Sequence, residues 1–185
     1  ELEDWTDSLQ FGASPKKYNT IHRETNILFG GSIDDVFSNT ETGEYHCVDY
    51  KSTATSSWGF REEITLDGEY QQGYKRQMDM YVWIGKQREL PMSSESLFLY
   101  ADGQNSSPTG EKLEGMYVEA SGAAQLRFHS TLIPYTADDS WVEHALLGVK
   151  ETLEKSVSPS HREGCEYGIY FASAWRESPP NVSGR

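Results

Sequence analysis

The order of elements in the sequence predicts a mixed α/β fold, with a central β-sheet and helices on its faces. Three observations lead to this prediction. Residues 45–53 are rich in β-forming residues and follow a turn-rich stretch at 38–43, which is typical of a hairpin. Residues 73–87 repeat apolar side chains at helical spacing. Residues 96–101 and 126–135 then indicate two further strands, before a final pair of helices.

The first third of the chain indicates short strands. Residues 1–17 form a loop or a short helix, and residues 18–24 a first strand. Residues 25–37 are richer in apolar side chains, but Gly30 and Gly31 interrupt them, as at a bulge or a close backbone approach. After the strand at 45–53, residues 52–70 are polar with scattered aromatic side chains, which indicates a long loop.

The predicted helices have clear local signals. The first, at 73–87, carries one stripe of side chains at helical spacing: Tyr74, Gln77, Met78, Tyr81 and Ile84. Acidic residues at 138–139 suit the first turn of a helix at about 141–155. Residues 164–175 indicate a last short helix. We find no repeat or linker, and therefore expect one domain over 1–185, with a core at about 18–135 and a helical extension at about 138–178.

Composition restricts the class of protein. A chain of 185 residues with 36% hydrophobic and 12% aromatic side chains is too apolar to be disordered. No apolar run approaches the ~20 residues of a membrane helix, so we expect no membrane association. The acidic start has no signal-peptide pattern, which favours a cytoplasmic location. The chain begins at Glu1 rather than Met, so we expect that upstream residues can be missing.

Charge and cysteine content limit the possible partners. The net charge is −13, from 16 basic and 29 acidic side chains, and phosphate contacts normally need Lys and Arg. A bound cation concentrates positive charge locally, so a nucleic-acid site needs a metal or a protein partner that supplies basic surface. The 2 cysteines, Cys47 and Cys165, are too few for a four-cysteine metal site, and a disulfide between them stays open.

Two acids and one lysine lie around the predicted hairpin. Asp34 comes before the turn, and Asp49 and Lys51 follow it on one strand. Alternate side chains of a strand share a face, so Asp49 and Lys51 point one way and Tyr50 the other. Two carboxylates suit Mg²⁺ or Mn²⁺, with the backbone carbonyl of Tyr50 as a third ligand. Lys51 then orients an attacking water or offsets negative charge in phosphodiester hydrolysis.

Three motifs in this order resemble a known superfamily. They are G-x-x-D at Gly31–Asp34, D-Y-K at Asp49–Lys51 and Q-x-x-x-Y at Gln77–Tyr81. Together they resemble the PD-(D/E)XK nucleases, in particular the RecB-like branch that includes the CRISPR-associated adaptation nucleases. The resemblance implies a restriction-endonuclease-like core and a metal-dependent deoxyribonuclease of DNA repair or recombination. It also implies that Asp34 and Asp49 bind metal, that Lys51 is catalytic, and that Gln77 and Tyr81 support the site.

The chain departs from that pattern at two places. The RecB-like branch has an upstream His or Glu as a further metal ligand, and the candidates are His22 and Glu24, or a residue before residue 1. The tail SPSHREGCEYGIY resembles a P…C-x-x-C-x-Y tail that holds an iron–sulfur cluster in some relatives. Gly168 stands at the second cysteine position, so we expect no iron–sulfur cluster.

The residues that contact DNA, and two other functions, stay open. Lys75 and Arg76 flank the Q-x-x-x-Y motif and suit phosphate contacts, although an exposed helix face explains them equally well. Trp58 suits base stacking or simple packing. One alternative is a nucleic-acid-binding module of the same fold with impaired catalysis. The other is a small α/β interaction protein with a chance D-x-K, which predicts that Asp34 and Asp49 lie apart.

Overall fold

The structure is a computed structural model, and it describes residues 7–10, 12–54, 64–104, 122 and 127–177. The chain divides into two compact units, Glu1–Leu147 and Gly148–Arg185, which are described separately. The boundary falls inside helix α3 (Val142–Glu154). No helix among the described residues has the length and apolar character needed to span a membrane.

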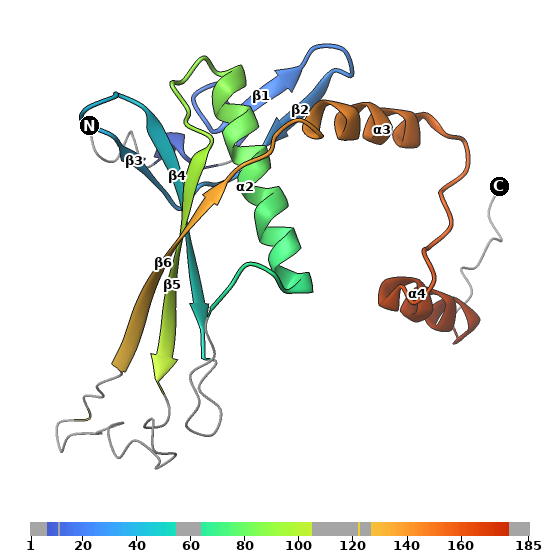
Figure 1. Cartoon of the computed structure of the whole chain (residues 1–185). Helices are drawn as coiled ribbons and strands as arrows, with labels where there is room; N and C mark the ends of the chain where they lie inside the picture. The colour runs from blue at the N-terminus through green and yellow to red at the C-terminus, as the bar shows by residue number, and fades with distance from the viewer. Residues whose placement is uncertain (1–6, 11, 55–63, 105–121, 123–126, 178–185) are drawn as a thin grey trace. The chain divides into compact units, whose positions relative to one another are not determined.

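The first unit is built on a mixed four-stranded sheet with the order β3-β4-β5-β6 (Figure 1). β4 pairs with β3 in antiparallel and with β5 in parallel orientation, and β5 and β6 are antiparallel. This sheet with its flanking helices confirms the predicted α/β class. The bounds of the strands are Asp35–Ser38 for β3, Tyr45–Thr53 for β4, Glu95–Gln104 for β5 and Arg127–Thr136 for β6.

The β3–β4 turn is stabilised by its own residues. Asn39 Oδ1 accepts hydrogen bonds from the backbone N–H groups of Glu41 and Thr42, at 2.9 and 3.2 Å. Gly43 has a φ of +76°, a conformation that suits glycine. The turn therefore sets the register in which β3 and β4 pair.

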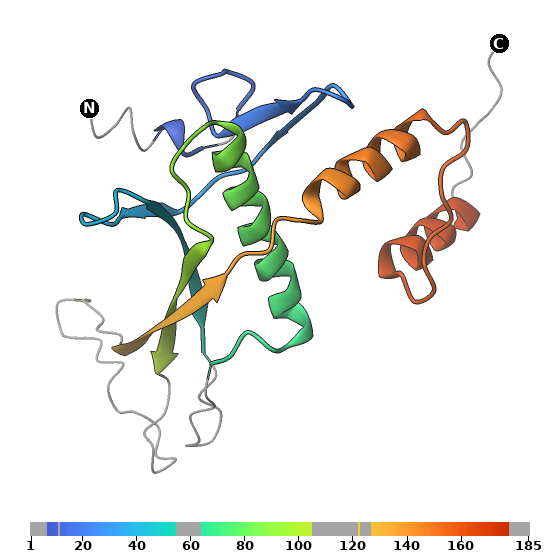
Figure 2. The ribbon, with the colours of Figure 1, turned by 45° about the horizontal axis from the view of Figure 1, so that its top comes forward.

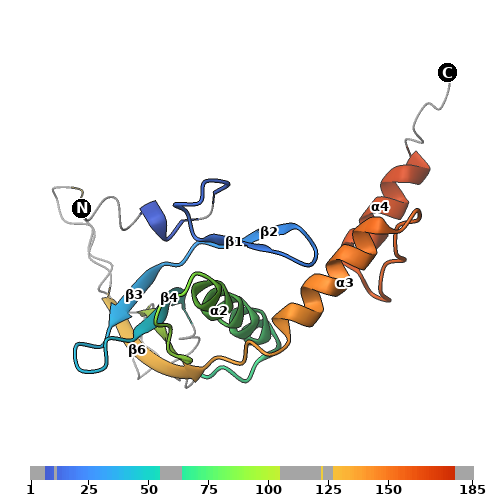
Figure 3. The same cartoon turned by 90° about the horizontal axis from the view of Figure 1, so that it is seen from above.

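Helix α2 (Glu69–Gln87) crosses one face of this sheet (Figure 2). Seen end-on, it lies between the sheet and a two-stranded hairpin of β1 (Asn19–His22) and β2 (Ile27–Gly30) (Figure 3). Because the helix is covered from two directions, its second half is buried nearly all round. The buried residues are Met78, Asp79, Tyr81, Val82, Trp83, Ile84 and Gly85.

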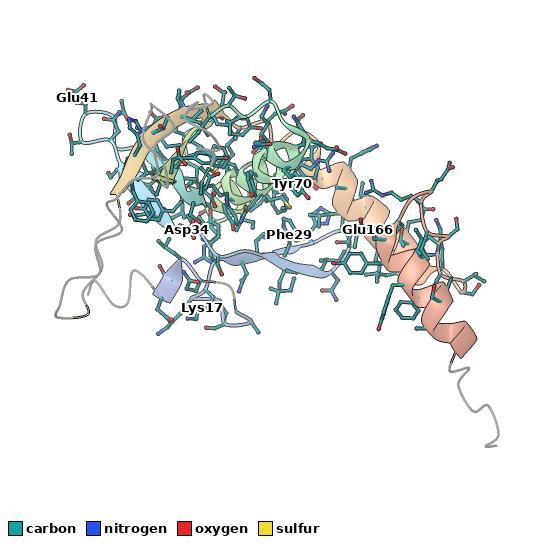
Figure 4. The ribbon with its side chains drawn as sticks, turned by 90° about the horizontal axis from the view of Figure 1, so that it is seen from below. Lys17, Phe29, Asp34, Glu41, Tyr70 and Glu166 are labelled. Carbon is teal, nitrogen blue, oxygen red and sulfur yellow. The ribbon has the colours of Figure 1, made fainter. Side chains whose placement is uncertain are left out.

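The hairpin packs on α2 through aromatic side chains. Phe29 projects from β2 towards the helix (Figure 4), and its ring meets Trp83 edge-on with centroids 5.8 Å apart. Tyr18, directly before β1, donates a hydrogen bond from its hydroxyl to the carbonyl of Tyr81 at 2.6 Å. On the sheet side, Met78 packs in one buried cluster with Cys47 and Phe98. Each such fully buried side chain contributes roughly 1.5–3 kcal/mol.

Asp79 links α2 to the segment that follows β6. This buried carboxylate accepts three hydrogen bonds, from the Tyr135 hydroxyl at 2.8 Å, the Asp138 backbone N–H at 3.0 Å and the Trp141 indole N–H at 2.9 Å. Three donors compensate the desolvation of a buried carboxylate. The start of α3 is thereby held against the sheet unit.

The helix and strand limits correct the sequence-based prediction in two places. Helix α2 begins at Glu69, one turn before the predicted start at Gly73, because a glycine inside a well-packed helix weakens it by only about 1 kcal/mol. Strand β5 extends past residue 101 to Gln104, because it pairs along its whole length with β6. Tertiary pairing here overrides the low strand preference of Gly103.

The second unit holds the rest of α3 and helix α4 (Glu166–Glu177). Helix α4 starts directly after Cys165, which is a free thiol, as is Cys47. The Cys165 sulfur lies 3.7 Å from Nδ1 of His161. Several large apolar side chains of α4 are exposed: Tyr167, Ile169, Tyr170 and Phe171.

Candidate active site

The register between β3 and β4 brings two aspartates together. Asp35, the first residue of β3, pairs with Val48, so Asp34 directly before it lies close to Asp49, the residue after Val48. Asp34 itself lies in a bend directly before β3 rather than in the strand, at the passage from the hairpin to the sheet (Figure 4). Its Oδ2 accepts a hydrogen bond from the backbone N–H of Tyr50 at 2.8 Å, which fixes the carboxylate beside β4.

Asp49 is a buried carboxyl group with a second one at its side. It is 3% exposed, and the Asp34 carboxyl group lies near enough to affect its pKa. Burial raises the pKa of Asp49, Lys51 lowers it, and the neighbouring Asp34 raises it again, with a net upward shift. The two nearby acids therefore disfavour the ionised form of Asp49, and the Lys51 ammonium offsets this only in part.

Lys51 lies on the same face of the sheet as Asp49, as the alternation of the strand predicts. Its ammonium forms an ion pair with Asp49 Oδ2, lies 3.4 Å from Gln77 Oε1, and stands 4.4 Å from the centre of the Tyr74 ring. These three partners fix the position of the Lys51 amine. Tyr50 points the other way: it is 45% exposed, and its hydroxyl donates to Asp35 Oδ2 at 2.5 Å.

The Q-x-x-x-Y residues extend this cluster along α2. Gln77 Nε2 donates to the hydroxyl of Tyr81 at 2.6 Å, while Gln77 Oε1 faces Lys51. The two residues are four apart, so the helix brings them to one side, as predicted. A continuous chain of polar contacts therefore runs from Asp49 through Lys51 and Gln77 to Tyr81.

Gly31 has a steric reason to be glycine. A Cβ atom at this position would lie 2.4 Å from Cε1 of Tyr81, far inside van der Waals contact. The tyrosine ring therefore packs directly on the Gly31 backbone. The G-x-x-D and Q-x-x-x-Y motifs thus contact each other at this point, next to Asp34.

The upstream ligand candidates lie elsewhere. His22 is buried, and both of its ring nitrogens are in contact with other groups: Nδ1 with Thr25 Oγ1 at 2.8 Å and Nε2 with Glu143 Oε2 at 2.6 Å. Glu24 is exposed in the β1–β2 turn, at the far end of the hairpin from Asp34. Neither residue lies near the two aspartates, because the hairpin extends away from Asp34.

The predicted DNA contacts are separated from the cluster. On a helix with 100° per residue, Lys75 and Arg76 point away from the side that carries Tyr74, Gln77 and Tyr81. Arg76 is exposed, and Lys75 is half-buried. Trp58 lies outside the residues that the structure describes.

The donor atoms at this position fit a hard divalent cation. In the described part of the chain, no group of three or more His, Cys, Asp or Glu side chains is arranged around one metal position. The available donors are two carboxylates and one backbone carbonyl. The carbonyl of Tyr50 faces the same edge as its N–H, because both groups of a strand residue point to one side. Asp49 Oδ2 is buried and paired with the Lys51 ammonium, and carboxylate oxygens are ligands that suit Mg²⁺ or Mn²⁺.

Two tyrosines join this cluster beyond the motif residues. Tyr74 contributes the ring beneath the Lys51 ammonium. Tyr100 lies on β5 opposite Lys51 in the parallel register. The helical spacing that predicts the stripe with Gln77 also predicts the position of Tyr74. The position of Tyr100 follows from the pairing of β4 with β5, which the sequence does not specify.

Comparisons of the chain with protein-family models, with curated proteins and with solved structures find no match. The motif residues and their geometry are therefore the basis of any functional assignment. An interaction protein with a chance D-x-K would keep Asp34 and Asp49 apart, whereas here Asp34 accepts a hydrogen bond from the backbone of Tyr50, the residue next to Asp49.

Proposed function

We propose that this protein is a divalent-metal-dependent nuclease that hydrolyses DNA phosphodiester bonds, with a PD-(D/E)XK core of the RecB-like branch. The observation that supports it best is the meeting of Asp34, Asp49 and Lys51 at one point on the sheet. In metal-dependent phosphodiester hydrolysis, carboxylates can hold the metal ion and an amine can offset the negative charge that develops on the phosphate. We propose cytoplasmic DNA repair or recombination as its setting.

The chemistry assigns a role to each group. When bound, Mg²⁺ or Mn²⁺ lowers the pKa of a water molecule and polarises the phosphate. Asp34, Asp49 and the Tyr50 carbonyl would hold the ion. Lys51, held by Gln77 and Tyr74, presents a positive charge where negative charge develops on the phosphate.

The net charge of −13 disfavours binding of DNA by the chain alone. We propose that a protein partner with a basic surface brings DNA to the site. Lys75 and Arg76, on another side of α2, would contact phosphates away from the scissile bond, and Trp58 stays a predicted stacking residue.

The decisive experiment compares purified variants with Mn²⁺ on single-stranded DNA, double-stranded DNA and RNA. Lys51→Ala and Asp49→Asn are expected to lower the cleavage rate by about 10²-fold or more, since each removes a charge that acts on the transition state. Lys150→Ala is the matched control, because this half-exposed lysine pairs with Glu154 one helical turn away. Cleavage by Lys51→Ala at the wild-type rate would contradict the proposal.

A catalytically impaired binding module is the second candidate. It is favoured by one observation: among the described residues, no third acid or histidine joins Asp34 and Asp49. This candidate predicts that Mn²⁺ and DNA bind without product formation. Calorimetry with Mn²⁺ and a gel-shift assay, run beside the cleavage assay, distinguish the two functions.

A further inference from the structure

Tyr100 is a buried tyrosine on the face of the sheet that carries Asp49 and Lys51. In the parallel pairing of β4 and β5 it lies opposite Lys51, and Phe98 lies opposite Asp49. Residues in register point to the same side, so the Tyr100 side chain shares the face of the two charged groups. The residue is 4% exposed, and its ring lies in the same buried cluster as Tyr81.

The hydroxyl of Tyr100 has no hydrogen-bond partner in the described part of the protein. Among the described residues, the buried Ser96 Oγ shares this property, whereas Asp49 Oδ2 is paired with the Lys51 ammonium. Tyr100 and Asp49 are diagonal neighbours on adjacent strands of one face, within reach of long side chains. Burial raises the pKa of Tyr100, and so do Tyr74 and Asp49, as expected for a hydroxyl that faces these groups.

Buried polar atoms without a partner are destabilising, and native proteins satisfy most of them, often with ordered water. An internal water needs two to four polar partners. Tyr100 Oη and Asp49 Oδ2 supply two, and the Lys51 ammonium, which is paired with that same oxygen, supplies a third. One water molecule at this position would give the Tyr100 hydroxyl a partner and link it to the Asp49–Lys51 ion pair.

We propose that Tyr100 is a positioning residue of this site, whose hydroxyl donates a hydrogen bond to an ordered water that bridges it to the Asp49–Lys51 ion pair. The water fixes the orientation of the Asp49 carboxylate and of the Lys51 amine. The structural part of this inference is independent of the reaction. Its catalytic part rests on the proposed nuclease function.

The first test is a high-resolution crystal structure of the metal-free protein and of Tyr100→Phe. A water within hydrogen-bonding distance of both Tyr100 Oη and Asp49 Oδ2 is expected in the wild type and absent in the variant. A direct hydrogen bond of Tyr100 to a protein group, or no water at this position, overturns the proposal.

Thermal unfolding gives a second test, because the two explanations predict different changes in the Tm of Tyr100→Phe. If the water bridge exists, Tyr100→Phe removes a hydrogen bond and leaves a buried water or carboxylate oxygen without a partner. The substitution therefore lowers the Tm. If the hydroxyl is merely unpaired, its removal leaves the Tm unchanged or higher, which contradicts the proposal. Ser96→Ala is the matched control, since it deletes another buried unpaired hydroxyl on the same strand and face, four residues from Tyr100.

The catalytic part is tested on DNA with Mn²⁺. Loss of one positioning hydrogen bond is expected to lower kcat about tenfold with little change in KM, whereas Ser96→Ala keeps the wild-type kcat. A wild-type kcat for Tyr100→Phe overturns this part. If wild type and Lys51→Ala cleave equally, the nuclease proposal fails, and the crystal structure and the Tm still decide the role of Tyr100.

Discussion

At Asp49, burial and a neighbouring carboxyl group act in the same direction. Both favour the protonated form, and the nearby Lys51 offsets them only in part, so the pKa lies above its ordinary value of 3.8. The contribution of Asp49 to folding stability is therefore largest at low pH and is lost as the pH rises above 3.8 and through the raised pKa. A bound cation reverses this relation, because it needs the ionised carboxylate.

We therefore predict that the affinity for Mn²⁺ increases as the pH rises through the raised pKa of Asp49. Binding near that pH releases a proton, so the binding enthalpy depends on the ionisation enthalpy of the buffer. Isothermal titration calorimetry in two buffers at several pH values measures this dependence. Asp49→Asn should remove it together with most of the binding, and a pH-independent affinity in the wild type would rule out Asp49 as a ligand.

The close approach at Gly31 gives a steric prediction. In Gly31→Ala the new methyl group meets the buried Tyr81 ring, so the ring or the backbone must shift. We expect a loss of stability of about 1–3 kcal/mol, as for other overpacked positions, and weaker cleavage because Tyr81 holds Gln77. Denaturant unfolding and the Mn²⁺ cleavage assay measure the two effects.

Gly73→Ala is the matched control for this change. Gly73 lies inside α2, and a Cβ atom there meets nothing within 4 Å in the described part of the protein. The substitution should therefore stabilise the helix by about 0.5–1 kcal/mol. Equal effects of the two substitutions would show that the contact between Gly31 and Tyr81 is unimportant.

At the scale of elements, α2 joins the site to the core. Its stripe of Tyr74, Gln77 and Tyr81 lies on the side of the helix that contacts Lys51 of β4. Trp83 contacts the β1–β2 hairpin instead. The sequence predicted this stripe and the shared face of Asp49 and Lys51, because periods of 3.6 and 2 residues are local properties. It did not predict that β4 and β5 are parallel, since strand pairing is non-local, and Tyr100 was missed for this reason.

The hydrogen bond within the Q-x-x-x-Y motif is testable on its own. In Tyr81→Phe the Gln77 amide loses its acceptor, so we expect a loss of about 0.5–1.5 kcal/mol in the free energy of unfolding. A double-mutant cycle with Gln77→Ala should give a coupling energy of similar size. Strictly additive effects of the two substitutions would show that the hydrogen bond is not formed in solution.

At the scale of the whole sheet unit, Asp79 connects α2 to β6 and to the segment before α3. Asp79→Ala leaves three donors without an acceptor, so we predict a loss of about 3–5 kcal/mol in stability. The Trp141 indole loses its partner, and its fluorescence should shift in the folded state. Asp139→Ala, which removes only the ion pair with Lys86, should cost less than about 1 kcal/mol.

The same scale explains why His22 lies away from the two aspartates. His22 was a candidate because it is a histidine that precedes Asp34 in the sequence. In the fold, the β1–β2 hairpin runs away from Asp34, and His22 contacts Glu143 instead, a residue far along the chain. Proximity in sequence and proximity in space separate where a strand is extended, because each residue adds about 3.3 Å.

Because the chain bends at Asp34, β3 does not extend to the position opposite Tyr50. If β3 continued backwards in its register, a backbone group would pair with Tyr50 and complete the ladder. Instead a side chain takes the amide, and a main-chain oxygen is left facing outward beside two acids. The length of this short edge strand thus controls whether the backbone groups of Tyr50 are paired within the sheet. Two more paired residues would turn the same sequence of acids and amine into ordinary sheet.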